Sequence, residues 1–547
     1  MNADAWEFTA EGGKHAVFAY NGEDSLYRRR VLRMRKSDIS TAAAVVQEKQ
    51  FERHAPRITA IEEEKVFCKN NIAQIQMEKI LRPTLGPQYL DAPVSVKING
   101  SFAAKLWRKA LESGKISASR FASWRATKID DSTDCTKIDA VLMVDYTRIL
   151  PTLSPEPIGN IIDARRSTLS IEIKPKAGFI SCSPLISCKR RIKLIKSRFA
   201  IQQNLLHSGK IKRGWGRGTK MSAYNPLDMF SQEKSRIKTA IECLIEQPQN
   251  NIKIWHCGKM IFGHDNVEMD DDCFNGLLES TFPFLCQHLA ESDVMKVPVR
   301  EQLLNVTADV TTAILAKEPL LHRIRSLQML DKIDADGAIA VWNRMVGLCS
   351  GDEHEAERLV DQQRMSVRDG LGVNGVQHSA YVEPQNYNSL EKFEEQLLSF
   401  RTTVRPLQED GVVPETSKLD RYHFNTMKLV NDLTKEECAH TLADWLLSLA
   451  MCDLSVFVTF RPVTNWRLFE DENFGIQELQ TENTPGSVRP VLTKFGDVNM
   501  KIAASYLYQL KLVDFDPKPV CKLRNRDESE KSFETVGRVN HGRDGNA

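Results

Sequence analysis

Two lysines close together follow a strand-like pattern at residues 169–174. The stretch EIKPKAGF at residues 172–179 places Glu172 and Lys174 on one side of a strand, because side chains alternate between its two faces. Pro175 cannot donate to a sheet and ends the strand, and Lys176 follows directly. Lysines at a strand end can face a cleft, where each ammonium acts as a point charge on a phosphate. The pattern indicates an anion site after this strand.

These lysines open a segment without Asp or Glu that extends from Ile173 to Leu227, in a chain of 547 residues whose formal net charge is only +2. Its basic residues are Lys174, Lys176, Lys189, Arg190, Arg191, Lys193, Lys196, Arg198, Lys210, Lys212, Arg213, Arg217 and Lys220. A solvated basic face, a polyanionic small molecule and a nucleic-acid backbone would each suit such a segment. Nucleic acid is the weaker choice, because few aromatic residues lie between the basic ones. A polyanionic small molecule is favoured.

A glycine pair precedes another strand-like stretch near the start of the chain. Gly12 and Gly13 lie in EGGKHAVF at residues 11–18, and Arg33 lies in a second strand-like stretch at residues 31–35. Taken alone, such a glycine pair before a strand is more often a simple turn. Together the two stretches resemble a glycine loop laid over phosphates with a cation on the next strand. A P-loop is excluded, because GxxxxGK[ST] does not occur.

The stretch EIKPKAGF resembles the signature of the inositol-pentakisphosphate 2-kinase family. Further matches follow in family order and cover about residues 8–525: the glycine loop at 11–18, WR at 124–125, DYT at 145–147, YNPLDMFS at 224–231, PQNN at 248–251, residues 327–337, DLSVFV at 453–458 and DFDPKP at 514–519. The resemblance implies a kinase that transfers the γ-phosphoryl of ATP to the 2-hydroxyl of inositol 1,3,4,5,6-pentakisphosphate and gives the hexakisphosphate, phytate. The alternative is a non-catalytic inositide- or RNA-binding scaffold that keeps the fold.

The resemblance also implies roles for single residues. Asp453 corresponds to the catalytic base. Asp514 corresponds to the magnesium-binding carboxylate, with Asp516 as a second ligand. The nucleotide site corresponds to Gly12, Gly13, Arg33, Asp145 and Tyr146, and the inositide site to Arg125, Lys174, Lys176, Asn250, Asn251, Lys518 and Lys522. The expected cofactors are ATP and Mg²⁺, since phosphoryl transfer needs a metal carboxylate and a positioning carboxylate.

One stretch departs from the family pattern. Where the family has RFxMHQxxK, residues 198–206 are RFAIQQNLL, so Gln202 replaces a histidine and Leu206 replaces a lysine. One or two phosphate contacts are then missing, or are supplied by Lys210 or Lys212. We expect the departures to alter which inositol phosphate binds best.

The strands and helices expected around these residues indicate an α+β, two-lobed fold. Residues 15–20, 31–35, 140–144 and 169–174 read as strands, and residues 236–245 and 301–331 as amphipathic helices, the second interrupted at Pro319. We expect an antiparallel-sheet N-lobe at 1–146 and a larger α/β C-lobe at 147–525. Residues 351–418 have few long apolar runs and predict a mobile surface insertion, and the charged tail 526–547 predicts disorder.

Composition narrows the class and the compartment. At 41% hydrophobic and 27% charged residues, the chain is typical of a globular protein rather than a disordered one. The sequence shows no secretory signal and no membrane span, and its 12 cysteines form no CxxC pair, which predicts reduced thiols in the cytoplasm or nucleus. We expect a monomer without nucleic-acid partners. A structural zinc is not expected, because Cys349 with His354 and Cys438 with His440 lack a four-ligand spacing.

Overall fold

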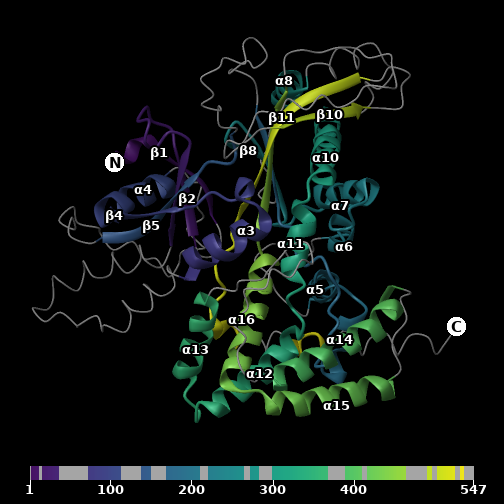
Figure 1. The fold of residues 1–547 in the computed structure, drawn as a ribbon. Helices are drawn as coiled ribbons and strands as arrows, with labels where there is room; N and C mark the ends of the chain where they lie inside the picture. The colour runs from purple at the N-terminus through teal and green to yellow at the C-terminus, as the bar shows by residue number, and fades with distance from the viewer. Residues whose placement is uncertain are drawn as a thin grey trace, which may run out of the picture.

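The structure is a computed structural model. It describes residues 2–11, 15–35, 72–112, 137–148, 168–209, 220–263, 271–282, 299–366, 388–409, 416–462, 489–495, 502–523 and 530–534. Figure 1 shows one sheet on the left, the strands of a second sheet at the top, and a layer of helices at the bottom. This arrangement of helices with two separate sheets confirms the α+β class.

The first sheet is antiparallel and has the order β1-β2-β3-β5-β4. Its strands are β1 (Trp6–Glu11), β2 (His15–Tyr20), β3 (Arg30–Arg35), β4 (Val94–Asn99) and β5 (Lys137–Val144). The expected strands at 15–20, 31–35 and 140–144 are therefore confirmed, whereas β1 and β4 were not predicted. Helix α4 (Gly100–Glu112) buries an apolar stripe against this sheet, with Ala103, Leu106 and Trp107 in the core.

The second sheet, also antiparallel, has the order β10-β11-β9-β6-β7-β8. Its strands are β6 (Leu169–Ile173), β7 (Ile252–His256), β8 (Lys259–Phe262), β9 (Ser455–Pro462), β10 (Arg489–Phe495) and β11 (Ile502–Val513). The β6 strand ends before Pro175, as the sequence predicts. It lies between β7 and β9, so its last residues are supported on both sides.

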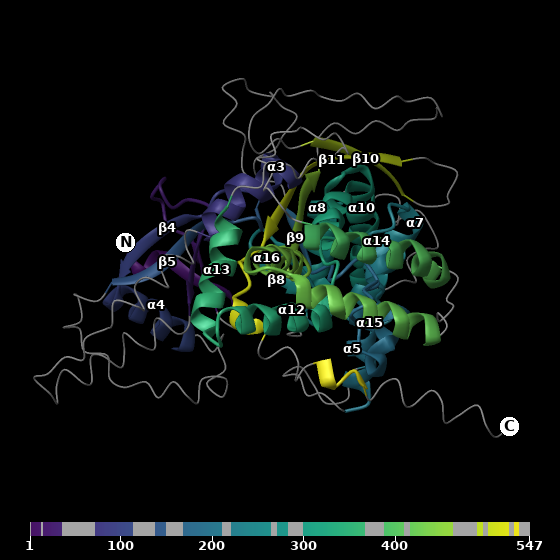
Figure 2. The same cartoon turned by 60° about the horizontal axis from the view of Figure 1, so that its bottom comes forward.

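Helices of the larger lobe pack around this sheet and below it (Figures 1 and 2). They are α5 (Arg198–His207), α6 (Pro226–Met229), α7 (Lys234–Glu246), α8 (Asp271–Thr281), α10 (Val299–Lys317), α11 (Leu320–Gln328), α12 (Asp334–Leu348), α13 (Glu353–Met365), α14 (Asn388–Glu409), α15 (Thr416–Asp432) and α16 (Lys435–Met451), with short 3-10 turns η5 (Cys188–Leu194) and η7 (Val520–Lys522). The predicted break at Pro319 separates α10 from α11. A capping box of Thr434 and Glu437 begins α16.

The expected mobile insertion at 351–418 is wrong for most of its described residues. Helices α13 and α14 and the start of α15 occupy it. Their apolar residues are few but recur at helical spacing, and Val360, Phe393, Leu397 and Phe400 are buried. Part of the expected disordered tail is also placed, because Glu530 and Phe533 are buried. Residues 367–387, 410–415 and 535–547 lie outside the described residues.

A short helical segment of the predicted N-lobe packs in the core of the second sheet. The π-helical turn η2 (Met77–Leu81), α3 (Arg82–Leu85) and the turn η3 (Pro87–Tyr89) bury Met77, Leu81 and Leu85 there. Tyr89 donates a hydrogen bond of 2.5 Å to the buried Glu318, which fixes this segment to the end of α10. Residues on the N-terminal side of residue 146 thus contribute to the core of the second sheet as well as to that of the first. The lobe boundary at residue 146 stays a prediction.

Candidate active site

Three strand ends meet at one edge of the second sheet. Because β9 is antiparallel to both β6 and β11, Ile173 pairs with Val456 and Val513 pairs with Ser455. The C-terminal ends of β6 and β11 therefore lie beside the start of β9. This register places Lys174, Asp514 and Asp453 at the same edge, although they are far apart in the sequence.

Lys174 and Asp514 form an ion pair at this edge. The Lys174 ammonium lies 3.4 Å from the Asp514 carboxylate, which also accepts a long hydrogen bond of 3.5 Å from the Ser455 hydroxyl. The same hydroxyl donates to Glu172 at 3.0 Å. Burial would lower the pKa of Lys174, but Asp514, Glu172 and Asp453 outweigh it and raise the pKa above its ordinary value. Lys174 is therefore charged at neutral pH.

Asp453 lies between the end of α16 and the start of β9 and pairs with Lys518. The Lys518 ammonium donates to the Asp453 carboxylate at 2.7 Å. Desolvation alone would raise the pKa of Asp453, but the positive charges of Lys518, Lys176 and Lys174 outweigh it and lower the pKa. Asp453 is thus an ionised carboxylate at neutral pH, and its side chain is 58% exposed.

A cation of the first sheet contacts two carboxylates that follow β11 of the second sheet. Arg33 on β3 donates two hydrogen bonds to Asp516, at 2.7 and 3.2 Å, and lies 3.5 Å from Asp514. This bidentate pairing lowers the pKa of Asp516 against the opposing effect of its desolvation. Arg33 also contacts the His15 ring at 3.1 Å, and burial together with the Arg33 charge lowers the pKa of His15 to about 4. His15 is therefore neutral near pH 7.

At the expected hinge, Tyr146 contacts the second sheet, whereas the Asp145 carboxylate contacts the turn that follows it. The Asp145 carboxylate accepts from the backbone N–H and the hydroxyl of Thr147, at 3.0 and 2.5 Å. The Tyr146 carbonyl accepts from Thr459 of β9 at 2.5 Å and from Ser170 of β6 at 3.2 Å. Burial, together with Asp91, raises the pKa of the Tyr146 phenol. These contacts are structural, and the nucleotide role of both residues stays a prediction.

Asn251 supports the lysine strand, whereas Asn250 is exposed. The Asn251 carbonyl accepts from the Lys174 backbone N–H at 2.8 Å, and its side chain is buried. The neighbouring Gln249 exchanges two side-chain hydrogen bonds with Gln203 of α5, at 3.0 and 2.9 Å. Gln203 lies between Gln202 and Leu206 along the helix, so the departures from the family pattern occur on a helix fixed to the Asn250 loop.

Four expected site residues have no described side chain. Gly12, Gly13 and Arg125 lie outside the described residues, and Lys522 is described only as the last residue of η7. Of the other expected residues, the structure brings Lys174, Lys176, Asp453, Asp514 and Lys518 to one sheet edge. Asp516 lies in the same loop as Asp514, and Arg33 joins them from β3 of the first sheet. Their roles in binding or catalysis stay predictions.

Part of the basic segment is used inside the protein. Lys193 is only 3% exposed, and its ammonium contacts Asp334, lies 3.3 Å from Asp336 and lies 2.9 Å from Glu530. The members of this ionic cluster are Arg190, Lys193, Arg198, Asp334, Asp336, Glu530 and Glu534. The expectation that the whole segment serves an anionic ligand is wrong for these three cations, because acids distant in sequence already neutralise them.

The ionic cluster is also the one group of possible metal ligands among the described residues, formed by Asp334, Asp336 and Glu530. The Lys193 ammonium lies among the three carboxylates and occupies the position that a metal ion would take. Of the zinc candidates, Cys438 is buried, which raises the pKa of its thiol to about 12 and keeps it protonated. The expectation of no structural zinc stays a prediction.

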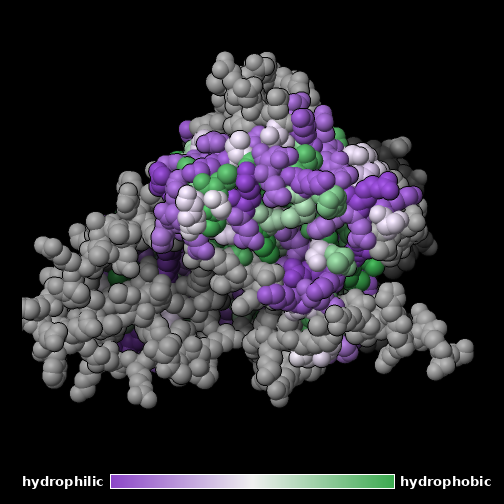
Figure 3. Space-filling model, turned by 90° about the horizontal axis from the view of Figure 1, so that it is seen from below, coloured by the Kyte–Doolittle hydropathy of each residue, from purple (hydrophilic) through white to green (hydrophobic). Residues whose placement is uncertain are grey.

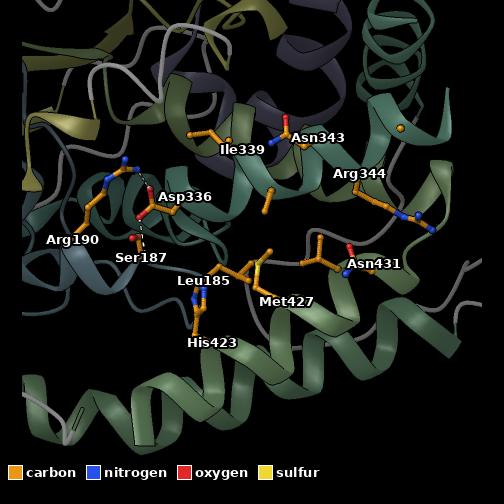
Figure 4. Close-up of a pocket in the computed structure, with 13 residues that line it drawn as sticks. Leu185, Ser187, Arg190, Asp336, Ile339, Asn343, Arg344, His423, Met427 and Asn431 are labelled. Carbon is orange, nitrogen blue, oxygen red and sulfur yellow. Dashed lines mark hydrogen bonds and ion pairs between the residues drawn. The ribbon is translucent and has the colours of Figure 1, made fainter. Parts of the chain in front are cut away.

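A surface cleft of about 610 Å³ lies apart from the sheet edge, between α12 and α15 (Figure 4). The paired Arg190 and Asp336 form one end, and Arg344, Asn343 and Asn431 lie toward the other. The face seen from below mixes polar and apolar side chains (Figure 3). None of the expected site residues lines this cleft. Volume alone therefore does not locate the chemistry.

No helix among the described residues has the length and apolar character that a membrane span requires.

A profile of the inositol-pentakisphosphate 2-kinase family matches residues 8–532. A relative from Arabidopsis thaliana, an inositol-pentakisphosphate 2-kinase, is 25% identical over 365 residues, which cover 62% of this chain and 69% of the relative. One of the same name from Danio rerio is 28% identical over 289 residues, covering 52% and 50%. The chain belongs to the inositol-pentakisphosphate 2-kinase family and is a transferase.

Proposed function

We propose that this protein transfers the γ-phosphoryl group of ATP to the 2-hydroxyl of inositol 1,3,4,5,6-pentakisphosphate and forms the hexakisphosphate. The observation that carries the proposal is the sheet edge itself. Two aspartates, Asp453 and Asp514, lie there on neighbouring strand ends with lysines beside both. A positioning carboxylate and a metal carboxylate within a basic site are what this chemistry requires.

Asp453 is the base in this proposal. Its lowered pKa keeps it ionised near neutral pH, so it can accept the proton of the 2-hydroxyl. The hydroxyl oxygen then forms a bond to the γ-phosphorus, the bond to the bridging oxygen breaks, and ADP leaves with the electron pair. The Lys518 contact at 2.7 Å holds the carboxylate in place until a phosphate of the substrate competes for that ammonium.

The carboxylates Asp514 and Asp516 fit magnesium, because hard divalent cations prefer oxygen ligands. A bound magnesium ion would neutralise phosphate charge. Arg33 contacts both carboxylates and comes from the strand that follows the expected glycine loop. It can thus hold a phosphate of ATP beside these acids.

The lysines account for the choice of substrate. Five phosphates carry about −8 to −10 charge at neutral pH, at roughly −1.5 to −2 each. Lys174 and Lys176 lie close enough to Asp453 that their charges lower its pKa, which supports an anionic substrate beside this carboxylate. Such charge-assisted contacts both bind the inositide and orient its free hydroxyl. A monomer in the cytoplasm or nucleus remains part of the proposal.

The test is incubation with Mg-ATP and a panel of inositol tetrakis- and pentakisphosphates, with the products separated by anion-exchange chromatography. We expect hexakisphosphate from the 1,3,4,5,6-isomer. Asp453→Ala should lower turnover by about 10²- to 10⁴-fold and leave inositide binding intact, because a base acts mainly in the transition state. Asp432→Ala, which removes an exposed carboxylate at the end of α15, is the matched control. Inositide binding without turnover by the wild type would favour the scaffold alternative.

A further inference from the structure

Gln328, the last residue of α11, joins the lysine loop, residues 174–178 after β6, to the end of α16, which leads into the aspartate loop, residues 452–454. It is fully buried, and its side-chain amide donates to the Lys176 carbonyl at 2.8 Å and to the Met451 carbonyl at 3.1 Å. Its side-chain oxygen accepts from the Gly178 backbone N–H at 2.8 Å. Two carbonyls face the amide nitrogen and one N–H faces the oxygen, so the surroundings fix the orientation of the amide.

The lysine loop needs such support, because Lys176 has a positive φ of 63°. A residue with a side chain adopts this left-handed conformation at a cost and keeps it only when its surroundings impose it. Hydrogen bonds hold the loop on both sides of Lys176. Tyr224 donates to the Pro175 carbonyl at 2.8 Å, and Gln328 contacts residues 176 and 178. The hydrogen bonds of Gln328 to residues 176 and 178 therefore help to keep the Lys176 backbone in this conformation.

The same residue fixes the end of α16, the helix that leads to Asp453. The buried Ser448 hydroxyl donates to the Gln328 carbonyl at 2.5 Å, and the Gln328 amide holds the Met451 carbonyl. Asp453 follows Met451 by two residues and bonds back to Ala450 at 3.1 Å. A shift of Gln328 would therefore move both the lysine loop and the helix end that precedes Asp453.

We infer that Gln328 is a positioning residue, which sets the separation between the inositide lysine Lys176 and the base Asp453. The inference rests on the proposed function, in which these two residues act on the same substrate. The side-chain hydrogen bonds of Gln328 go to backbone groups of Lys176, Gly178 and Met451, so it acts through the two loops. A misplacement of reacting groups by about 1 Å lowers turnover by about 100-fold. Turnover should therefore be sensitive to the separation between Lys176 and Asp453.

Two substitutions test the inference. Gln328→Met removes all three side-chain hydrogen bonds at similar volume. Gln328→Glu keeps the shape but replaces the donor that faces two carbonyls with an acceptor. We expect each variant to lower kcat by about 10- to 100-fold and to raise KM for the inositide, with KM for ATP unchanged. A purely structural role would lower the melting temperature without this split between the two substrates.

Gln408 offers the matched control, because its side-chain amide also bridges two backbone carbonyls. It donates to Ser181 at 3.1 Å and to Leu194 at 2.7 Å, and both acceptors lie outside residues 174–178 and 451–454. Gln408→Met should keep wild-type kinetic constants. A folded Gln328→Met enzyme with wild-type kcat overturns the inference, and so does an equal rise of KM for ATP and for the inositide.

Two further measurements keep the test decisive. If neither Gln328 variant folds, Ser448→Ala is measured in their place. This variant keeps the Gln328 side-chain amide and removes only the hydroxyl that donates to the Gln328 backbone carbonyl. An unchanged kcat of Ser448→Ala then overturns the inference. The constants are measured with whichever inositol phosphate the wild type uses. If the wild type turns over none, the proposed function fails, and calorimetry with inositol hexakisphosphate still decides: weaker binding by Gln328→Met supports the lysine-loop half, and unchanged binding rejects it.

Discussion

Lysines from one acid-free stretch of sequence serve two different regions, the sheet edge around Asp453 and the ionic cluster around Lys193. At the sheet edge Lys174 is 20% exposed and shares Asp514, itself 36% exposed, with Arg33. In the ionic cluster Lys193 is 3% exposed and faces three carboxylates. The comparison shows that a run of like charges in the sequence does not define a binding site. Only charges that remain accessible can exchange water for a ligand.

The largest effect should come from breaking the ionic cluster. Lys193→Met leaves Asp334, Asp336 and Glu530 close together without their central cation. We expect unfolding free energy to fall by about 3–5 kcal/mol, because loss of one partner leaves buried charge unpaired. Denaturant unfolding followed by circular dichroism measures this. Lys189→Met, an exposed lysine of the same 3-10 turn, is the control and should change little. Equal stability of the two variants would contradict the buried role.

The corresponding change at the sheet edge should affect binding rather than stability. Lys174→Met removes one charge-assisted contact, worth about 1.5–3 kcal/mol, from the inositide site. KM for the inositide should rise by about 10- to 150-fold while KM for ATP changes less. Steady-state kinetics with each substrate varied in turn measure both constants. Lys220→Met, which removes an exposed charge from the same stretch, is the control. Similar increases of both constants would place Lys174 in the nucleotide site instead.

A smaller effect concerns the pH profile. Lys518 is the strongest influence that lowers the pKa of Asp453. A carboxylate whose pKa is lowered in the folded protein stabilises the fold at pH values above its pKa in the unfolded chain. The carboxylate becomes protonated, and this stabilisation is lost, as the pH falls through its pKa in the folded protein. In Lys518→Met the pKa of Asp453 should rise, so the acid limb of the kcat profile should move to higher pH. Because the lowered pKa of Asp453 lies below the ordinary carboxyl value, the profile is measured from about pH 3 to about pH 8. An acid limb at the wild-type position would assign the limb to another group.

The smallest effect tests the departure at α5. Leu206 is half-buried and belongs to none of the apolar core clusters of the described residues. Leu206→Lys should therefore be tolerated and tighten inositide binding by about 0–1 kcal/mol, since a partly exposed ion contact contributes little. The gain should shrink as salt rises. Thermal melts with and without inositide measure it. A lower melting temperature in both samples would show that Leu206 is a core residue.

Local chemistry made several elements predictable. Pro175 ends β6 because proline cannot donate to the sheet, and Pro319 separates α10 from α11. In contrast, residues 351–418 were predicted as an insertion, because Val360, Phe393 and Leu397 stand alone or beside one other apolar residue, in polar surroundings. Each nevertheless lies on a helix face that packs into a core. Isolated apolar residues reveal burial only when the partner surface is known.

The sequence alone determined which chemical groups the protein has and where some of its elements end, as at Pro175 and Pro319. The motif at residues 172–179 could be chosen for that reason, whereas the aspartates at 453 and 514 were chosen from the family resemblance. Only the tertiary structure decided which of these charges are available. Lys193 meets Asp334, which lies 141 positions later, whereas Gln328 reaches Lys176 across 152 positions. Coulomb and hydrogen-bond energies depend on distance in space, and that distance is fixed by strand register and helix packing rather than by order along the chain.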